Sequence, residues 1–116
     1  MRYTIITCSG ISNTGKLTTQ CGVALLQRSG GEIEACIPAI TERGVLDDAL
    51  MDAEKILVLD GCSDCCALKK LHQCDKEPDI HIIATDCGIK KRGMDDPQYK
   101  EIEDLTLTVQ KAIRKE

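Results

Sequence analysis

The sequence predicts an α/β fold: a small three-layer sandwich in which helices cover both faces of a mostly parallel sheet of about four strands. Two observations support this fold class. Short apolar segments alternate along the chain with segments whose apolar residues recur at helical spacing, an order typical of parallel strands joined by helices. In addition, Lys55–Asp60 is a continuous apolar run with charged ends, which indicates a strand buried on both faces.

The first half of the chain is expected to contain two strands with a helix between them. Residues 3–8 are apolar and rich in β-formers, and residues 12–15 offer turn and N-cap chemistry for a helix that extends to about Arg28. The apolar residues on one face of this helix are Leu17, Cys21, Ala24 and Leu25. Residues 32–37 then alternate like a strand, and Pro38 ends this run.

The second half repeats this alternation. A short helix is expected over Val45–Ala53, followed by the Lys55–Asp60 strand and by a helix that ends near Cys74. Asp79–Thr85 is the next expected strand, and Pro97 is expected to open the last helix. The inner faces of these last two helices are expected to carry Ala67, Leu68, Leu71 and Cys74, and Ile102, Leu105, Val109 and Ile113. Parallel strands with right-handed crossovers make the expected architecture flavodoxin-like or a reduced relative of it.

Length and composition restrict the class of protein. A chain of 116 residues predicts a single domain over residues 1–116. The formal charge is 15 − 19 = −4 and there is no basic tract, so we expect no nucleic-acid partner. The absence of Trp and Phe also removes aromatic surfaces on which bases stack. No apolar run is long enough for a membrane span, and the first residues lack the features of a signal peptide, so we expect a cytoplasmic protein without a membrane partner.

Eight cysteines in 116 residues are unusual, and four of them lie at or beside the predicted C-terminal ends of strands. These four are Cys8, Cys36, Cys62 and Cys87. Open parallel sheets bind ligands at this edge, so we expect the fold to bring the thiols together. In a reducing cytoplasm such cysteines more often bind metal or perform thiol chemistry than form disulfides. A tetrahedral Zn²⁺ ion would compensate the charge of the crowded thiolates.

A local group of three cysteines adds to this edge. If a helix begins near Cys62, then Cys62 and Cys66 project within about 40° of each other and can face one ion, whereas Cys65 is expected to be more exposed. Asp60 and Asp86 end two predicted strands, and we expect them either to orient metal ligands or to cap the following turns. The remaining cysteines and both histidines are interpreted as core or solvated residues, and these are Cys21, Cys74, His72 and His81.

Two further hypotheses remain beside metal binding. Residues 10–16 match the first seven positions of a phosphate-binding loop, but Leu17 replaces the Ser or Thr that holds Mg²⁺, so we interpret the loop as a tight turn with a helix cap. A thiol enzyme is the first alternative, with Cys8 as nucleophile over an anion-binding loop and Cys62 or Cys66 as resolving thiol. An iron–sulfur protein is the second, although the chain has no compact Cys-x-x-Cys-x-x-Cys run. The sequence assigns no catalytic residue and leaves open whether the protein is an enzyme.

Four groups of residues, spread over nearly the whole chain, are similar to a known family pattern in their order and spacing. They are Cys8-Ser9-Gly10 with Ser12-Asn13-Thr14-Gly15, Cys36-Ile37-Pro38-Ala39-Ile40, Val58-Leu59-Asp60-Gly61-Cys62 with Cys66-Ala67, and Ala84-Thr85-Asp86-Cys87-Gly88-Ile89. Through them the chain resembles the DGC-domain family, in which four cysteines are thought to chelate zinc and whose function is otherwise unknown.

The resemblance implies a ligand set for this chain. The family pattern maps onto Cys8, Cys36, Cys62 and Cys66 and implies Zn²⁺ as the cofactor. Cys65 and Cys87 lie where the pattern does not require cysteine, so either could replace one of the four. Four thiolates make a closed site without a position for water, which suits metal binding, metal transfer or a thiol switch better than hydrolysis. The metal ion is the expected partner, and a protein partner stays open.

Overall fold

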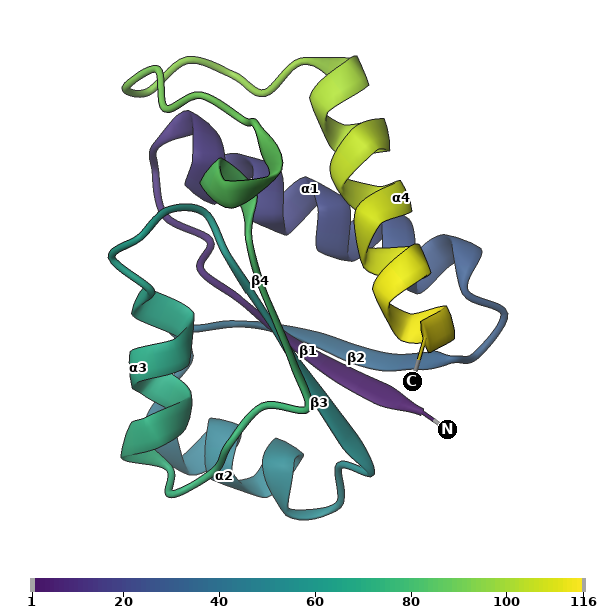
Figure 1. Cartoon of the computed structure of the whole chain (residues 1–116). Coiled ribbons are helices and arrows are strands. Elements are labelled where there is room, and N and C mark those ends of the chain that lie inside the picture. Colours follow the sequence, from purple (N-terminus) through teal and green to yellow (C-terminus); the bar gives the residue numbers. More distant parts are fainter. Residues whose placement is uncertain (1, 116) are drawn as a thin grey trace.

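The computed structural model describes residues 2–115 and confirms the α/β prediction (Figure 1). Met1 and Glu116, the two ends of the expected domain, lie outside the described residues. The strands are β1 (Tyr3–Thr7), β2 (Ile33–Pro38), β3 (Lys55–Asp60) and β4 (Ile80–Ile83). The helices are α1 (Asn13–Arg28), α2 (Arg43–Met51), α3 (Cys66–Gln73) and α4 (Tyr99–Lys115), with a short 3₁₀ helix η1 (Ala84–Cys87). Within the described residues, no helix is both long and apolar enough to cross a membrane.

The four strands are parallel and lie in the order β2-β1-β3-β4. This is the flavodoxin-like strand order without its fifth strand, which confirms the expectation of a reduced relative. Figure 1 shows α1 and α4 on one face of the sheet and α2 and α3 on the other. The chain passes from β1 to β2 on one side and returns to β3 on the other, so the strand order reverses between β1 and β3. Ligands bind at such a switch point, outside the C-terminal ends of the strands.

Alternate residues of the strands form two separate aliphatic cores. Ile5, Leu57 and Leu59 belong to the core beneath α1 and α4, whereas Ile6 and Val58 belong to the core beneath α2 and α3. All five side chains are fully buried, and burial of each contributes roughly 1.5–3 kcal/mol. This alternation also decides which face of the sheet a strand cysteine can reach.

The apolar faces expected for the first and last helices are confirmed. The buried residues among them are Leu17, Cys21, Ala24 and Leu25 in α1, and Leu105, Val109 and Ile113 in α4. Ser12 is the N-cap of α1, and its hydroxyl accepts a hydrogen bond from the Gly15 N–H (3.1 Å). The expectation of a tight turn with a helix cap at this position is therefore correct.

The expected start of the third helix is wrong, and the difference changes the geometry of the cysteines. α3 begins at Cys66 rather than near Cys62, because residues 61–65 form a turn in which the Cys65 N–H donates to the Cys62 carbonyl (3.1 Å). Cys65 has a left-handed backbone, with φ of 51°. Cys62 and Cys66 therefore do not project from one face of a helix.

Other boundaries also differ from the expectation, and α4 begins at Tyr99 rather than at Pro97. β4 ends at Ile83 rather than Thr85, because the Thr85 N–H donates to the Gly61 carbonyl (3.3 Å) and the chain turns into η1 across the end of β3. α2 covers Arg43–Met51 rather than Val45–Ala53. These shifts leave the layers and the strand order as expected.

Candidate metal centre

Two cysteines follow the strands at the switch point. Cys8 comes directly after β1, and its N–H donates to the Leu59 carbonyl of β3 (3.0 Å), so the pairing of the two central strands extends to this residue. Cys62 follows Asp60, the last residue of β3, after a single glycine, Gly61. Both thiols therefore lie at the C-terminal edge of the two central strands.

Cys66, the first residue of α3, approaches Cys8 from across this edge. The two cysteines line one cavity of about 440 Å³, and Lys69 and Lys70 of α3 lie along the same cavity. Partial burial raises the pKa of the Cys66 thiol, and the neighbouring Cys8 and Cys62 thiols add to this effect. Cys8, Cys62 and Cys66 thus come from three separate segments, and the first two act electrostatically on Cys66.

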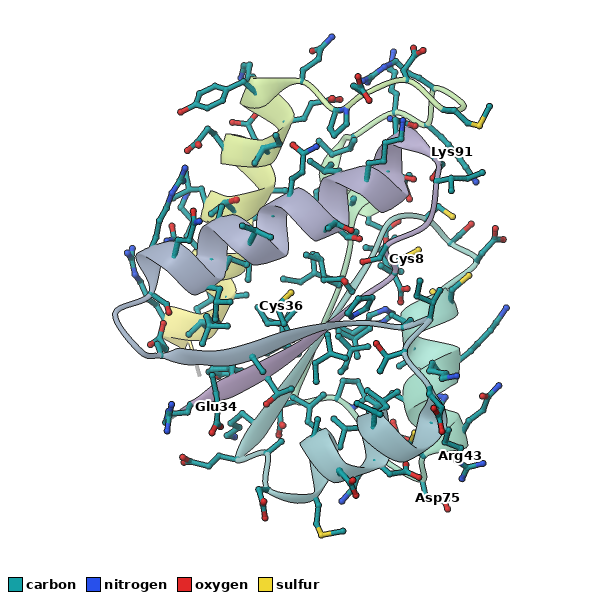
Figure 2. All side chains as sticks on the ribbon, turned by 180° about the vertical axis from the view of Figure 1, so that it is seen from behind. Cys8, Glu34, Cys36, Arg43, Asp75 and Lys91 are labelled. Atoms are coloured by element: carbon teal, nitrogen blue, oxygen red, sulfur yellow. The ribbon has the colours of Figure 1, made fainter. Side chains whose placement is uncertain are left out.

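Cys62 has charged neighbours of both signs. The Nζ of Lys91 lies 3.6 Å from the Cys62 sulfur, and an Asp64 carboxylate oxygen lies 3.7 Å from it. Lys91 belongs to the segment between η1 and α4, and Figure 2 shows it at the same end of the molecule as Cys8. The Cys62 sulfur therefore has one positive and one negative side chain beside it.

Cys36 lies apart from these three thiols. It pairs with Ile5 in the sheet and packs against the core beneath α1 and α4, whereas the cavity of Cys8 and Cys66 includes Ala39 of the opposite core. Figure 2 shows Cys36 beneath the middle of α1 and Cys8 at the far end of the sheet. A Cβ atom added to Gly22 would clash with the Cys36 sulfur, so the backbone of α1 lies very close to this thiol. Burial raises the pKa of Cys36 to about 11.

The other cysteines have distinct surroundings. Cys21 and Cys74 are buried in the two cores, as expected. Thr106 donates a hydrogen bond to the Cys21 sulfur (3.4 Å), and burial raises the pKa of Cys21 to about 11. Cys87 is exposed and lines a different cavity from that of Cys8, beside His81.

Asp60 caps the helix that follows it, which is one of the two roles expected from the sequence. Its carboxylate is fully buried and accepts hydrogen bonds from the N–H groups of Ala67 (2.8 Å) and Leu68 (3.3 Å). It therefore caps the N-terminus of α3 from the end of β3, which explains why α3 begins where it does. The same carboxylate lies 2.8 Å from Nε2 of His81 on β4.

Asp60, Cys65 and His81 form a group that could hold a metal ion. One ligand atom from each residue lies within 4.8 Å of the others, and the group combines oxygen, sulfur and nitrogen donors. Burial raises the pKa of the Cys65 thiol, and the Asp60 carboxylate raises it further. The three residues come from β3, from the turn before α3 and from β4.

Sequence spacing did not reveal this group. His81 was interpreted as structural or solvated, because no candidate ligand lies at a short, regular interval from it. In the sheet His81 pairs with Val58, two residues before Asp60, so both side chains are on the same face of neighbouring strands. The signal that could have found the group is therefore the register of two parallel strands.

The first turn of α1 is engaged in contacts with a later segment of the chain. The Asn13 side chain donates to the Lys90 carbonyl (2.8 Å) and accepts from the Arg92 N–H (2.6 Å). Lys16 donates to the Met94 carbonyl (2.7 Å) and pairs with Asp96 (3.2 Å). The polar residues that resemble a phosphate-binding loop thus hold the segment between η1 and α4, which gives them a structural explanation.

Burial predicts a large spread of thiol reactivity in the metal-free protein. Cys21 and Cys36, whose pKa values burial raises to about 11, are expected to react with iodoacetamide at pH 7.5 roughly tenfold more slowly than Cys66, because the reagent reaches the exposed Cys66 more easily and the thiolate is the nucleophile. Mass spectrometry of a time course in the presence of a chelator measures this difference, and in denaturant the eight cysteines should react alike. Equal rates for Cys21 and Cys66 in the folded protein would contradict the described packing.

These features define a class: a cysteine-rich α/β protein with a flavodoxin-like sheet and a group of side chains able to hold a metal ion at its C-terminal edge. The sequence model of the DGC domain matches residues 4–109, nearly the whole chain. The chain therefore belongs to the DGC domain family. Comparisons with curated proteins and with solved structures gave no significant match.

Proposed function

We propose that this protein binds Zn²⁺ through cysteine thiolates at the C-terminal edge of the sheet, with Cys8, Cys36, Cys62 and Cys66 as ligands. The observation that carries the proposal is the arrangement of Cys8 and Cys66 along one cavity at the switch point, with Cys62 acting on Cys66. Three thiols from separate segments in one place have little value for packing, because two of them line a cavity and the third is beside a lysine.

The donor set and its surroundings fit zinc. Zinc takes thiolate sulfur at about 2.3 Å, and its charge favours thiolates in a place where burial and neighbouring thiols disfavour them. A thiolate-rich zinc centre carries net negative charge. Lys69 and Lys70 along the cavity and Lys91 beside Cys62 supply positive charge to offset it.

Cys36 enters the ligand set through the family resemblance. Its thiol is beneath α1, on the opposite face from the Cys8 cavity, so its participation requires the end of β2 to rearrange around the ion. β2 is an edge strand that pairs with β1, which makes such a rearrangement easier than in the centre of the sheet. The zinc content of the Cys36→Ser variant tests this point. If the variant binds one zinc ion fewer than the wild type, Cys36 is a ligand; if its zinc content is unchanged, Cys36 is not a ligand.

The chemistry of such a centre suggests its role. A closed thiolate site leaves no position for a reactive water, so we propose metal binding, transfer or a thiol switch rather than hydrolysis. Each of these roles requires thiols that can be reduced, so we propose a reducing compartment such as the cytoplasm.

Metal analysis of protein purified without oxygen tests the proposal. We expect Cys8→Ser and Cys66→Ser each to contain one zinc ion fewer per chain than the wild type, and a strong chelator to unmask the corresponding thiols. Cys87→Ser, which changes an exposed cysteine beside another cavity, is the matched control and should keep the wild-type metal content. Unchanged zinc in both Cys8→Ser and Cys66→Ser would refute a thiolate centre at the switch point.

A further inference from the structure

The group of Asp60, Cys65 and His81 uses none of the ligands of the thiolate centre. Its three donor atoms lie within 4.8 Å of one another, and the distance between His81 Nε2 and an Asp60 carboxylate oxygen is 2.8 Å. A tetrahedral zinc ion with ligands at about 2.0–2.3 Å holds its donors roughly 3.3–3.8 Å apart, so the group is of the right size once His81 and Asp60 move slightly apart around the ion.

The group is held in place by the fold. Asp60 is fully buried and anchored by the two N–H groups at the start of α3. His81 is part of β4, and its side chain is about one-fifth exposed (22%). Cys65 is fixed by backbone hydrogen bonds on both sides, since its N–H donates to Cys62 and its carbonyl accepts from Lys69 (3.0 Å). A ligand group with this little freedom loses little entropy when it binds an ion.

The donors select the class of metal. An imidazole nitrogen, a thiolate sulfur and a carboxylate oxygen suit a divalent ion of intermediate softness such as Zn²⁺, whereas Ca²⁺ and Mg²⁺ prefer oxygen ligands throughout. On binding, the ion replaces the proton of the Cys65 thiol, which goes to solvent. It also takes the place of the Nε2 proton between His81 and Asp60, and solvent returns that proton to Nδ1, so the imidazole stays neutral in its other tautomer. The remaining lone pairs of Asp60 keep the hydrogen bonds to α3.

A second cavity lies beside His81 and is lined by residues of β4, η1 and α4. It has a volume of about 550 Å³ and is lined by His81, Asp86, Cys87 and Lys111, among others. Asp86 also acts electrostatically on Cys65, so an additional carboxylate lies near the group. Through His81, this cavity brings solvent to one of the three donors.

We propose that Asp60, Cys65 and His81 form a second metal site, separate from the thiolate centre, which binds one zinc-class divalent ion and keeps its fourth position open toward the cavity lined by His81. Three protein ligands with an open position are the arrangement of exchangeable or water-activating zinc, in contrast to the closed thiolate centre. The inference goes beyond the proposed function, because neither site needs the ligands of the other.

Titration of the metal-free full-length protein with Zn²⁺ against a chromophoric chelator tests this site, with Co²⁺ absorption as a second readout. We expect the wild type to bind about two ions, and His81→Gln and Cys65→Ser each to bind one fewer. The glutamine can still donate a hydrogen bond to Asp60, and Asp60 itself is left unchanged because it caps α3. His72→Gln, which alters an exposed histidine paired with Glu77, is the control and should bind as the wild type does.

The outcomes separate this site from the thiolate centre. If His81→Gln and Cys65→Ser lose an ion that Cys8→Ser and Cys66→Ser retain, the second site stands, whatever happens to the thiolate centre. If His81→Gln and Cys65→Ser bind as many ions as the wild type with unchanged affinity, the second site is refuted. A single ion that is lost in both sets of variants would also overturn it, because the two groups would then form one site.

Discussion

Replacing Asp60 by alanine is expected to lower the free energy of unfolding of the metal-free protein by about 3–5 kcal/mol. The carboxylate is fully buried and accepts hydrogen bonds from the Ala67 and Leu68 N–H groups, which would be left without this partner at the start of α3. His81 would lose its 2.8 Å contact at the same time. Urea unfolding in the presence of a chelator measures the change without a contribution from bound metal.

Two variants give this experiment its controls. Asp60→Asn keeps an oxygen acceptor for one of the two N–H groups, so we expect about half of the loss. Asp64→Ala removes an exposed carboxylate from the same turn and should change stability by about 0.5 kcal/mol or less. A loss of less than about 1 kcal/mol for Asp60→Ala would show that the cap is not what fixes the start of α3.

Gly61→Ala is expected to lower the free energy of unfolding by about 2–3 kcal/mol and to weaken zinc binding as well. A Cβ at this position would lie 2.8 Å from the carbonyl carbon of Thr14, 2.9 Å from its oxygen and 3.0 Å from the Gly15 nitrogen. These are backbone atoms of the first turn of α1, so no side-chain rotation relieves the contact. Relaxation must move the turn after β3 away from the start of α1, which shifts Cys62 relative to Cys8.

Denaturant unfolding and zinc titration of the same variant check both parts of this expectation. Gly44→Ala is the matched control, because Gly44 is exposed in α2 and its added Cβ would approach no atom closer than 3.7 Å. Alanine there should raise stability by about 0.5–1 kcal/mol through the lower entropy of the unfolded chain. A Gly61→Ala protein with wild-type stability and zinc affinity would contradict the close packing of this glycine against α1.

Asp60, Gly61 and Cys62 therefore have three different reasons for their identity. The aspartate caps a helix from inside the core, the glycine leaves room for the backbone of α1, and the cysteine reaches the switch point beside Lys91. Substitutions in these three consecutive positions are expected to fail in different ways, since they change a cap, a packing distance and a thiol.

Local pattern was sufficient for the class of fold. β3 is buried on both faces and is therefore a continuous apolar run, whereas α4 is buried on one face and its apolar residues recur at helical spacing. These two patterns can be recognised in the sequence. The parallel sheet followed from the alternation of strands and helices, whereas the tertiary structure gave the strand order. The start of α3 could not be predicted from the sequence, because the cap is the Asp60 side chain of β3 and the turn before the helix contains Cys65 with a positive φ.

The candidate site shows the same division. That Cys8 and Cys62 lie at one edge of the sheet follows from their places directly after strands. That Cys36 faces the other layer follows from its pairing with Ile5, which depends on register and on the exact end of β2. A shift of one residue would turn this side chain to the opposite face.

The sequence by itself determined the layers, the parallel strands, the aliphatic cores and the cysteine-rich edge, because each depends on the local order of apolar, polar and turn residues. The tertiary structure alone decided which thiols share a cavity and that Asp60, Cys65 and His81 meet. The physical reason is that contacts between residues of different elements depend on strand register and on the length of each turn. A difference of a single residue in either, which a local pattern does not resolve, moves a ligand to another face.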